Sequence, residues 1–297
     1  MRVRFSKYHG LGNDFLLLDL REAAEPPSAE LVRRLCDRHL GIGADGILAI
    51  HRPSCTGAHL KMVVHNADGS VPETCGNGIR CVAFHAVRSL PDFAEQRTLR
   101  VETDAGTVEA EILARGDFEG SVRVAMGRPH LEAAKIPVAS PLPGSEAVVS
   151  QPLEVDGRRL RLTALSFGNP HAVIFEGASA EEAARLGPSI ERHPAFPEGV
   201  NVGFARVEDG QVIHLTVWER GAGLTRACGS GACAAAVAGV LEGRVDAERP
   251  IKVHLPGGEL QIDVRPDLSL VSMAGPARFV FEGTVDLAAL EEALPCA

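Results

Sequence analysis

Two cysteines stand at matching places in two glycine-rich stretches of the chain. Cys75 opens "CGNGIRCVAFHAV" and Cys228 opens "CGSGACAAAVAGV". In each stretch a thiol precedes Gly-x-Gly and an apolar run that predicts a helix. The first N–H groups of a helix have no intrahelical partner and carry partial positive charge, so they bind carboxylates and stabilise a nearby thiolate. The pattern predicts two anion-binding helix starts, each with a thiol of lowered pKa that can act as a general base.

The two stretches are part of a longer internal repeat. Sliding the chain until Cys75 falls on Cys228 also places Gly76 and Gly78 on Gly229 and Gly231. A Gly-Asn turn precedes both copies, in "GNDF" from residue 12 and in "GNPH" from residue 168. This shared order favours a duplicated domain over two unrelated glycine-rich helix starts.

Two thiols on opposite faces of one carbon could invert it. One thiolate would remove a proton alpha to a carboxylate, and the opposite thiol would deliver one. Because that proton is weakly acidic, the site must stabilise the developing charge with donors aimed at the carboxylate and must exclude water. The sequence offers no competing metal-ligand set or cofactor motif, so we predict a reaction without metal or cofactor.

A literal G-x-G-x-x-G occurs from Gly41 to Gly46, in "GIGADG". In a dinucleotide site this motif follows a strand and opens a helix. Here it follows a predicted helix and precedes a predicted strand. We therefore do not predict NAD binding.

Short alternating strands dominate the rest of the chain. The spacing of apolar residues predicts helices at residues 29–39, 78–89, 180–186 and 231–242. Many hairpin-connected strands with few helices favour an α+β fold over a doubly wound sheet. The proline-rich stretch from Arg128 to Pro152 predicts a connection between two domains.

Composition excludes several classes of protein. The formal net charge is −9 and no cluster of Lys or Arg stands out, which argues against nucleic-acid or anionic-membrane partners. The start "MRVRFSKYHG" lacks the apolar region of a signal peptide. The stretch from Ala232 to Leu241 is too short to span a membrane, which takes about 20 residues. Seven cysteines argue against a disulfide scaffold. We predict a soluble, cytoplasmic protein.

Several motifs together resemble the diaminopimelate epimerase family. In chain order they are "GLGNDF", "GIGADG", "NADGSVPETCGNGIR", "GNPH", "VNVGF" and "ERGAGLTRACGSGA". The resemblance implies a cofactor-independent, two-thiol epimerase that interconverts LL- and meso-diaminopimelate, in lysine and peptidoglycan precursor biosynthesis, as a homodimer. It implies two pseudo-symmetric domains, each a mostly antiparallel strand layer around a central helix, with the active site in the cleft between them. The expected domains are residues 1–127, completed by 277–297, and residues 128–276.

The resemblance also implies roles for individual residues. Cys75 and Cys228 match the acid and base thiols, and His171 and Glu219 match residues thought to tune them. The substrate-binding positions are Asn13, Asn66, Gly76, Asn77, Asn169, Asn201, Glu219, Arg220, Gly229 and Ser230. Simpler readings stay open: helix capping at the Gly positions, turn-forming asparagines, a surface Glu-Arg pair, and a packed histidine.

Some features depart from the family or lie outside its motifs. Gly46 stands where some members carry a substrate-contacting Gln, and Leu224 where others carry Glu, so specificity stays open. The nearest rival function is a racemase of another amino acid on the same fold. A redox-active thiol protein fits less well because no C-x-x-C is present, and a phenazine-type isomerase shares the fold without the cysteine pair. We expect Cys81 and Cys233 in the core, whereas Cys36, Cys55 and Cys296 have no motif.

Overall fold

The computed structural model describes residues 2–22, 26–73, 75–140, 142, 147–177 and 179–286. Cys296 and the rest of the chain from residue 287 lie outside the described residues. Backbone contacts divide the chain into two compact units. The first runs to Val124 and resumes at Gly275, and the second is Ala125–Ala274. Two long strands, β7 (Glu119–Gly127) and β16 (Val271–Asp286), each carry residues of both units.

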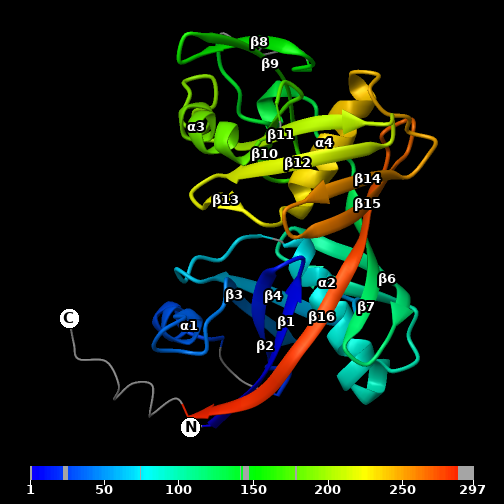
Figure 1. Ribbon diagram of the computed structural model, residues 1–297. Coiled ribbons are helices and arrows are strands. Elements are labelled where there is room, and N and C mark those ends of the chain that lie inside the picture. The colour runs from blue at the N-terminus through cyan, green and yellow to red at the C-terminus, as the bar shows by residue number, and fades with distance from the viewer. Residues whose placement is uncertain are drawn as a thin grey trace. The chain divides into compact units, whose positions relative to one another are not determined.

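The first unit is a ring of strands around a helix (Figure 1). Its further elements are β1 (Arg2–Gly10), β2 (Asn13–Asp19), α1 (Ala29–Cys36), β3 (Gly46–His51), β4 (Leu60–Asn66), α2 (Gly76–Ser89), the 3-10 helix η1 (Pro91–Phe93), β5 (Thr98–Thr103) and β6 (Gly106–Arg115). The strands pair in sequence order from β1 to β7 and then β16, which pairs back onto β1. Every residue of α2 from Asn77 to Val87 is buried, so this helix fills the ring.

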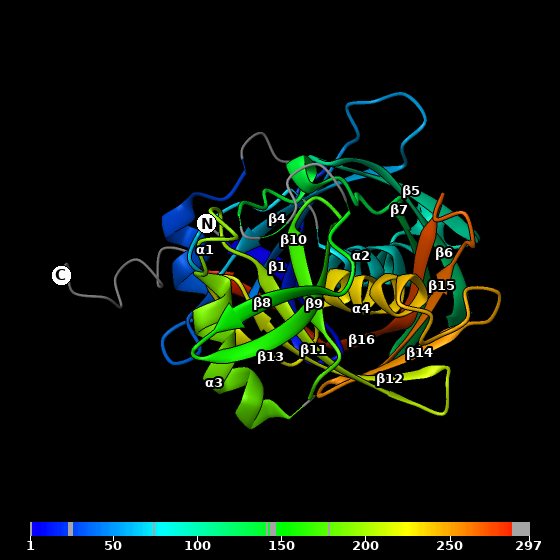
Figure 2. The same ribbon diagram turned by 90° about the horizontal axis from the view of Figure 1, so that it is seen from above.

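The second unit is built from the same parts. Its elements are the 3-10 helix η2 (Ala133–Lys135), β8 (Gln151–Val155), β9 (Arg158–Ser166), β10 (Pro170–Ile174), α3 (Ala180–Glu191), β11 (Asn201–Glu208), β12 (Val212–Glu219), β13 (Gly223–Thr225), α4 (Gly229–Leu241), β14 (Ile251–Leu255) and β15 (Gly258–Val264). The strand order is β8-β9-β10-β11-β12-β14-β15, followed by the first residues of β16. Helix α4 contacts β9 to β12, β14 and β15, and residues 231–239 are buried (Figure 2).

The direction of strand pairing repeats between the units. In the first unit β2–β3 and β4–β5 are parallel, whereas β1–β2, β3–β4 and β5–β6 are antiparallel. In the second, β10–β11 and β12–β14 are parallel, whereas β9–β10, β11–β12 and β14–β15 are antiparallel. The prediction of an α+β fold from two pseudo-symmetric halves is confirmed.

The smaller helices cover the other face of the strands. In the first unit, Leu16 and Leu18 of β2 share an apolar cluster with Val32 and Leu35 of α1. In the second, β10 and α3 meet in the same way, with Ala172, Ile174, Leu186 and Ile190 in one cluster. Successive side chains of a strand point to opposite faces of the sheet. The side chains that do not face the smaller helix therefore face the central helix. Strands β2 and β10 are therefore packed on both faces.

The helix ends differ in part from those predicted. Helix α1 stops at Cys36 because the next carboxylate, Asp37, accepts the backbone N–H groups of His39 and Leu40. Helix α3 continues past Pro188 to Glu191, since Leu186 and Ile190 lie on its buried face. Helices α2 and α4 begin two residues before their predicted starts, at the residues that follow the two cysteines.

The proline-rich stretch predicted as a connection is part of the second unit. Ile136, Leu142 and Val148 are buried in the apolar cluster of that unit. His130 pairs with Ser166 in a backbone bridge. In the described part of this stretch, these apolar residues thus join the core of the second unit.

Candidate functional site

Cys75 caps the start of α2 through its sulfur. Its backbone is extended (φ −148°, ψ 108°), and Sγ accepts the N–H of Gly78 at 3.3 Å. A Cβ on Gly78 would lie 2.7 Å from Leu48 Cδ2 and 3.5 Å from the sulfur, so glycine allows this close approach. The thiol is half-buried. An N–H aimed at sulfur suits a thiolate, as expected for a cysteine at a helix start.

Two predicted binding asparagines meet beside this cysteine. Nδ2 of the buried Asn77 donates to Oδ1 of Asn13 at 3.1 Å. Asn13 begins β2 directly after Gly12 (φ 85°), and its Nδ2 donates to Asp45 Oδ2 at 2.9 Å. Asn66 lies elsewhere in the unit, exposed at the end of β4, where Nδ2 donates to Ser70 Oγ at 2.9 Å.

The G-x-G-x-x-G segment ends a helix. The N–H groups of Ile42 and Gly43 donate to Leu35 O, and that of Ala44 donates to Cys36 O. These amides therefore satisfy carbonyl groups at the end of α1, as in other helix C-caps. The last glycine, Gly46, opens β3, and its position is closed to a side chain: a Cβ would lie 2.4 Å from His65 O.

Cys228 caps α4 with the same extended backbone (φ −121°, ψ 106°). Its Sγ lies 3.7 Å from Ser230 Oγ, and a Cβ on Gly231 would lie 3.2 Å from the sulfur. Burial raises the pKa of the Cys228 thiol well above its ordinary value, and the nearby Glu219 carboxylate raises it further. The expectation of a lowered pKa is wrong for Cys228, because loss of water outweighs the Gly231 amide and the Ser230 hydroxyl.

Asn169 and His171 form a chain that leads to this thiol. His171 Nε2 lies 3.1 Å from Asn169 Oδ1, and Asn169 Nδ2 donates to Ser230 Oγ at 3.3 Å. Burial lowers the pKa of His171 to about 3, with a smaller effect from Arg220, so the ring is neutral at pH 7. Nε2 therefore carries the proton and donates to Asn169. His171 is thus a neutral ring that is connected to the thiol through Asn169 and Ser230.

The remaining predicted residues gather where β12 ends. Glu219 is the last residue of β12, and its Oε1 accepts a hydrogen bond from Thr225 Oγ1 at 2.5 Å. Buried Asn201 accepts the backbone N–H of Arg220 at 3.0 Å and donates to Pro170 O at 2.9 Å. The exposed Arg220 places Nη1 2.7 Å from Glu198 O. Asn201 thus holds the turn that presents the other two side chains.

Other residues of these clusters were not predicted. Arg80 of α2 is fully buried, with Nη2 donating to Asn77 Oδ1 at 2.9 Å. Its signal in the sequence was a charged residue near the start of an otherwise apolar run. Glu191 accepts Trp218 Nε1 at 2.6 Å and the N–H of Gly221 at 3.0 Å, which braces the turn after β12. No local pattern marks Glu191, because its partners come from another element.

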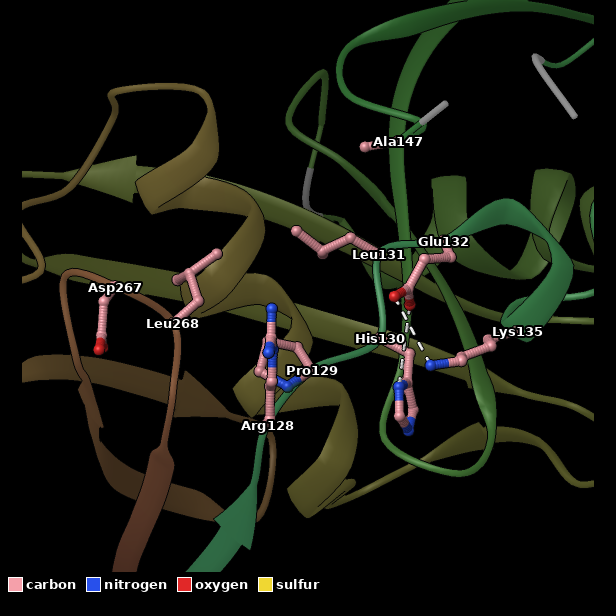
Figure 3. A pocket seen from close by; sticks show the side chains of 9 residues that line it. All are labelled: Arg128, Pro129, His130, Leu131, Glu132, Lys135, Ala147, Asp267 and Leu268. Carbon is pink, nitrogen blue, oxygen red and sulfur yellow. Dashed lines mark ion pairs between the residues drawn. The ribbon is translucent and has the colours of Figure 1, made fainter. Parts of the chain in front are cut away.

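A separate cavity of about 310 Å³ lies in the second unit (Figure 3). Its lining comprises Arg128, Pro129, His130, Leu131, Glu132, Lys135, Ala147, Asp267 and Leu268. Glu132 pairs with Lys135 at 3.6 Å and lies 4.0 Å from His130. None of the predicted site residues lines it, so the cavity is distinct from both cysteine clusters.

Within the described residues, no three His, Cys, Asp or Glu side chains gather as a metal-binding group. The same part of the chain holds no helix with the length and apolar character to cross a membrane.

The sequence model of the diaminopimelate epimerase family matches residues 5–132 and 163–280. The chain belongs to this family. A diaminopimelate epimerase from Desulforudis audaxviator is 48% identical over 284 residues, covering 95% of this chain and 98% of that protein. Those from Nostoc punctiforme and Moorella thermoacetica are 44% and 45% identical, covering 95% and 96% of this chain and 99% and 100% of theirs. The family predicted from the motifs is confirmed, and with it the class of isomerase.

Solved structures share the fold at low sequence identity. A hydroxyproline epimerase from Agrobacterium vitis has a TM-score of 0.68 at 16% identity, covering 96% of this chain and 91% of its own. A phenazine biosynthesis protein from Bacillus anthracis has a TM-score of 0.65 at 17% identity, covering 96% and 99%. Diaminopimelate epimerases therefore share their two-unit architecture with proteins of other named activities.

Proposed function

We propose that the chain interconverts LL- and meso-diaminopimelate, a step of lysine and peptidoglycan precursor biosynthesis, by proton transfer between Cys75 and Cys228. One observation carries the proposal: each cysteine is the N-cap of the central helix in one of two equivalently built units. The names of the relatives support the substrate, at 43–48% identity over nearly the full chain.

The two thiols start the reaction in different states. The Cys75 sulfur accepts a backbone N–H, which favours a thiolate, whereas burial and Glu219 keep Cys228 protonated. In the LL-to-meso direction, the Cys75 thiolate removes the α proton and becomes a thiol. The electron pair stays on the α carbon and spreads into the carboxylate. The Cys228 S–H bond then breaks, its proton forms the new C–H bond on the opposite face, and a thiolate remains on Cys228. The meso isomer is converted back by the reverse steps.

The helix starts stabilise the negative charge. In α2 the first intrahelical bond runs from Ile79 N to Cys75 O, so the amides of Gly76 and Asn77 precede it. In α4 the corresponding bond runs from Ala232 N to Cys228 O, so the amides of Gly229 and Ser230 precede it. We assign these four amides to the carboxylate next to the reacting carbon. Donors already in place are worth about 2.7–4 kcal/mol each when aimed at a developing oxyanion.

Diaminopimelate has a second amino acid group, at the end away from the reacting carbon. Binding this distal group requires both hydrogen-bond donors and acceptors. An asparagine amide supplies both, and a guanidinium forks onto a carboxylate. We assign this head to Asn13, Asn66, Asn169, Asn201 and the exposed Arg220, with Glu219 accepting from an ammonium group. No cofactor or metal is needed in this scheme.

Proton exchange in D₂O tests reaction and substrate together. We expect LL-diaminopimelate to exchange its α proton and to yield the meso isomer, read by NMR and chiral chromatography. Other amino acids, proline and glutamate among them, are the controls and should not exchange. Exchange of proline or glutamate at a comparable rate would instead support a racemase of another amino acid.

We further propose that the enzyme is a cytoplasmic homodimer. Phe118 is 67% exposed, and Val280 and Phe281 of β16 are 48% and 45% exposed, which gives the first unit an apolar surface for a second copy. Two reactive thiols also require a reducing compartment. Light scattering at several concentrations, with Val280→Lys as the variant, tests the dimer. A monomeric mass for the wild-type protein would contradict it.

A further inference from the structure

We propose that Arg80 and Asp45 are positioning residues that fix which atoms Asn13 and Asn77 present to the substrate. The four side chains form one hydrogen-bonded chain, Arg80–Asn77–Asn13–Asp45, with distances of 2.9, 3.1 and 2.9 Å. The inference rests on the proposed function, because it assumes that the asparagines contact substrate.

The two ends of the chain determine the orientation of both amides. A guanidinium only donates hydrogen bonds, so the Asn77 atom facing Arg80 must be the carbonyl oxygen. The Asn77 NH₂ then faces Asn13, whose carbonyl oxygen must accept it. This leaves the Asn13 NH₂ for Asp45, whose carboxylate only accepts. Rotating either amide by 180° would place like groups together at two contacts.

The donor end cannot move. Arg80 is fully buried, and its Nε donates to Pro276 O of β16 at 3.3 Å while Nη2 holds Asn77. Gly10 leaves no spare room beside it, since a Cβ there would lie 2.9 Å from Nη2. A planar guanidinium group that donates to two acceptors in different directions is held in one orientation.

The acceptor end is held by several donors. Asp45 Oδ2 accepts the N–H of Asp14 at 3.1 Å as well as Asn13, and Oδ1 accepts Arg38 Nη2 at 2.7 Å. Arg38 also binds Asp14, which pairs with the buried Lys7 at 2.5 Å. The carboxylate is therefore fixed in place although Asp45 itself is exposed.

We expect the hydrogen-bonded chain Arg80–Asn77–Asn13–Asp45 to act on substrate binding. After these contacts Asn13 keeps one N–H and one carbonyl lone pair, both with fixed directions. In the second unit Asn169 and Ser230 take the places of Asn13 and Asn77. There Ser230 Oγ lies 3.7 Å from the Cys228 sulfur, whereas Asn77 is held by Arg80. Disturbing it should raise KM and leave kcat nearly unchanged, the pattern expected for lost uniform binding.

A double-mutant cycle on full-length enzyme tests the inference. We expect Asp45→Asn, which removes the acceptor-only end, to raise KM for LL-diaminopimelate by roughly 10-fold with kcat within about twofold, the size of one charged hydrogen bond. In an Asn13→Ala background the same change should have almost no further effect, because the two residues act as one unit. In an Asn66→Ala background its full effect should remain. Asp37→Asn is the matched control: an exposed carboxylate of the same loop that accepts only backbone N–H groups, so KM should not change.

Arg80→Met tests the buried end, with Arg80→Lys as the variant that restores one donor. We expect a larger rise of KM for Met than for Lys and the same coupling to Asn13→Ala. If Arg80→Met does not fold, the Asp45 cycle decides. Independent effects of Asp45→Asn and Asn13→Ala, or an unchanged KM in Asp45→Asn, would overturn the inference while epimerisation by the wild type stands. Absence of epimerisation in the wild type would instead overturn the proposed function.

Discussion

The carboxylate of Glu219 lies against the thiol of Cys228 and, after burial, is the largest cause that raises the pKa of this thiol. The two residues come from the end of β12 and the start of α4. Burial and Glu219 therefore favour the protonated form of the Cys228 thiol. The Cys75 sulfur accepts the N–H of Gly78, as Cys228 accepts that of Gly231, but Cys75 is only half-buried. This difference in surroundings supports the proposal that the two topologically equivalent thiols take opposite roles.

This asymmetry predicts the alkaline limb of the pH–rate profile. A thiol of raised pKa keeps its proton above the ordinary cysteine value of about 8.5, so the limb set by Cys228 lies above pH 9. Replacing Glu219 by Gln removes a negative charge and should move this limb to lower pH. The measurement is kcat/KM for LL-diaminopimelate from pH 6 to pH 10. The pH at which the alkaline limb falls is the readout, because the variant also lowers the maximal kcat/KM. An unchanged position would contradict the assignment of this limb to Cys228.

Buried neutral histidines predict a loss of stability in acid. Burial lowers the pKa of His171 to about 3 and that of His85 to about 4, so both stay neutral in the folded enzyme below pH 6.5 while the unfolded chain takes up protons. The unfolded state then binds more protons, and stability falls as pH falls. Two such groups give a slope of up to about 2.7 kcal/mol per pH unit between pH 6 and pH 4.

Urea unfolding at pH 7, 6 and 5 measures this slope. His85→Gln should make the slope smaller by up to about 1.4 kcal/mol per pH unit, because one group that titrates only in the unfolded chain is gone. His39→Gln, at an exposed position, controls for the replacement of a histidine by glutamine as such. Equal free energies of unfolding at pH 7 and pH 5 would show that these histidines are not held neutral.

The different burial of the two thiols predicts the order of alkylation. Cys75 is half-buried with an N–H on its sulfur, whereas Cys228 is buried and protonated. In a background without the exposed Cys55 and the C-terminal Cys296, iodoacetamide should modify Cys75 first, and activity should be lost in step. Peptide mass mapping against time gives the order. Preferential modification of Cys228 would exclude Cys75 as the resting thiolate.

Variants of neighbouring cysteines separate chemistry from packing. Cys75→Ala should lower kcat by at least roughly 100-fold, the range of general base catalysis, in a folded protein. Cys81→Ala is the matched control, since Cys81 lies in the same helix, is buried, and has a pKa raised to about 12 by burial. It should lose stability and keep its kcat. Near-normal turnover in Cys75→Ala would rule out the two-thiol mechanism.

The backbone around Gly46 leaves no room for a side chain, so a substitution there should destabilise the fold. A Cβ there would meet a backbone oxygen of β4 at 2.4 Å, so Gly46→Ala should destabilise the enzyme by about 1–3 kcal/mol, as overpacking does. Leu224 is 42% exposed in β13, so Leu224→Glu should change stability by less than about 0.5 kcal/mol. Thermal unfolding of both variants checks this, and equal losses would show that the β3–β4 pair adapts freely.

The sequence by itself determined the repeat, the family and the two cysteine-capped helices. These features are local or periodic: a thiol before Gly-x-Gly, apolar runs of helical length, and strands with alternating residues. The repeat predicted a duplicated domain and the hairpin-connected strands predicted an α+β fold, whereas the arrangement of strands around a central helix came from the family resemblance. The helix ends were uncertain by only a few residues.

Only the tertiary structure decided the chemistry around those cysteines. The chain Arg80–Asn77–Asn13–Asp45 joins β2, α2 and the loop before β3, and no spacing in the sequence marks it. The raised pKa of Cys228 likewise depends on burial and on Glu219, which outweigh the local effect of the helix start. Desolvation and hydrogen bonding depend on what other elements place around a group, so they follow from the fold and not from the neighbours along the chain.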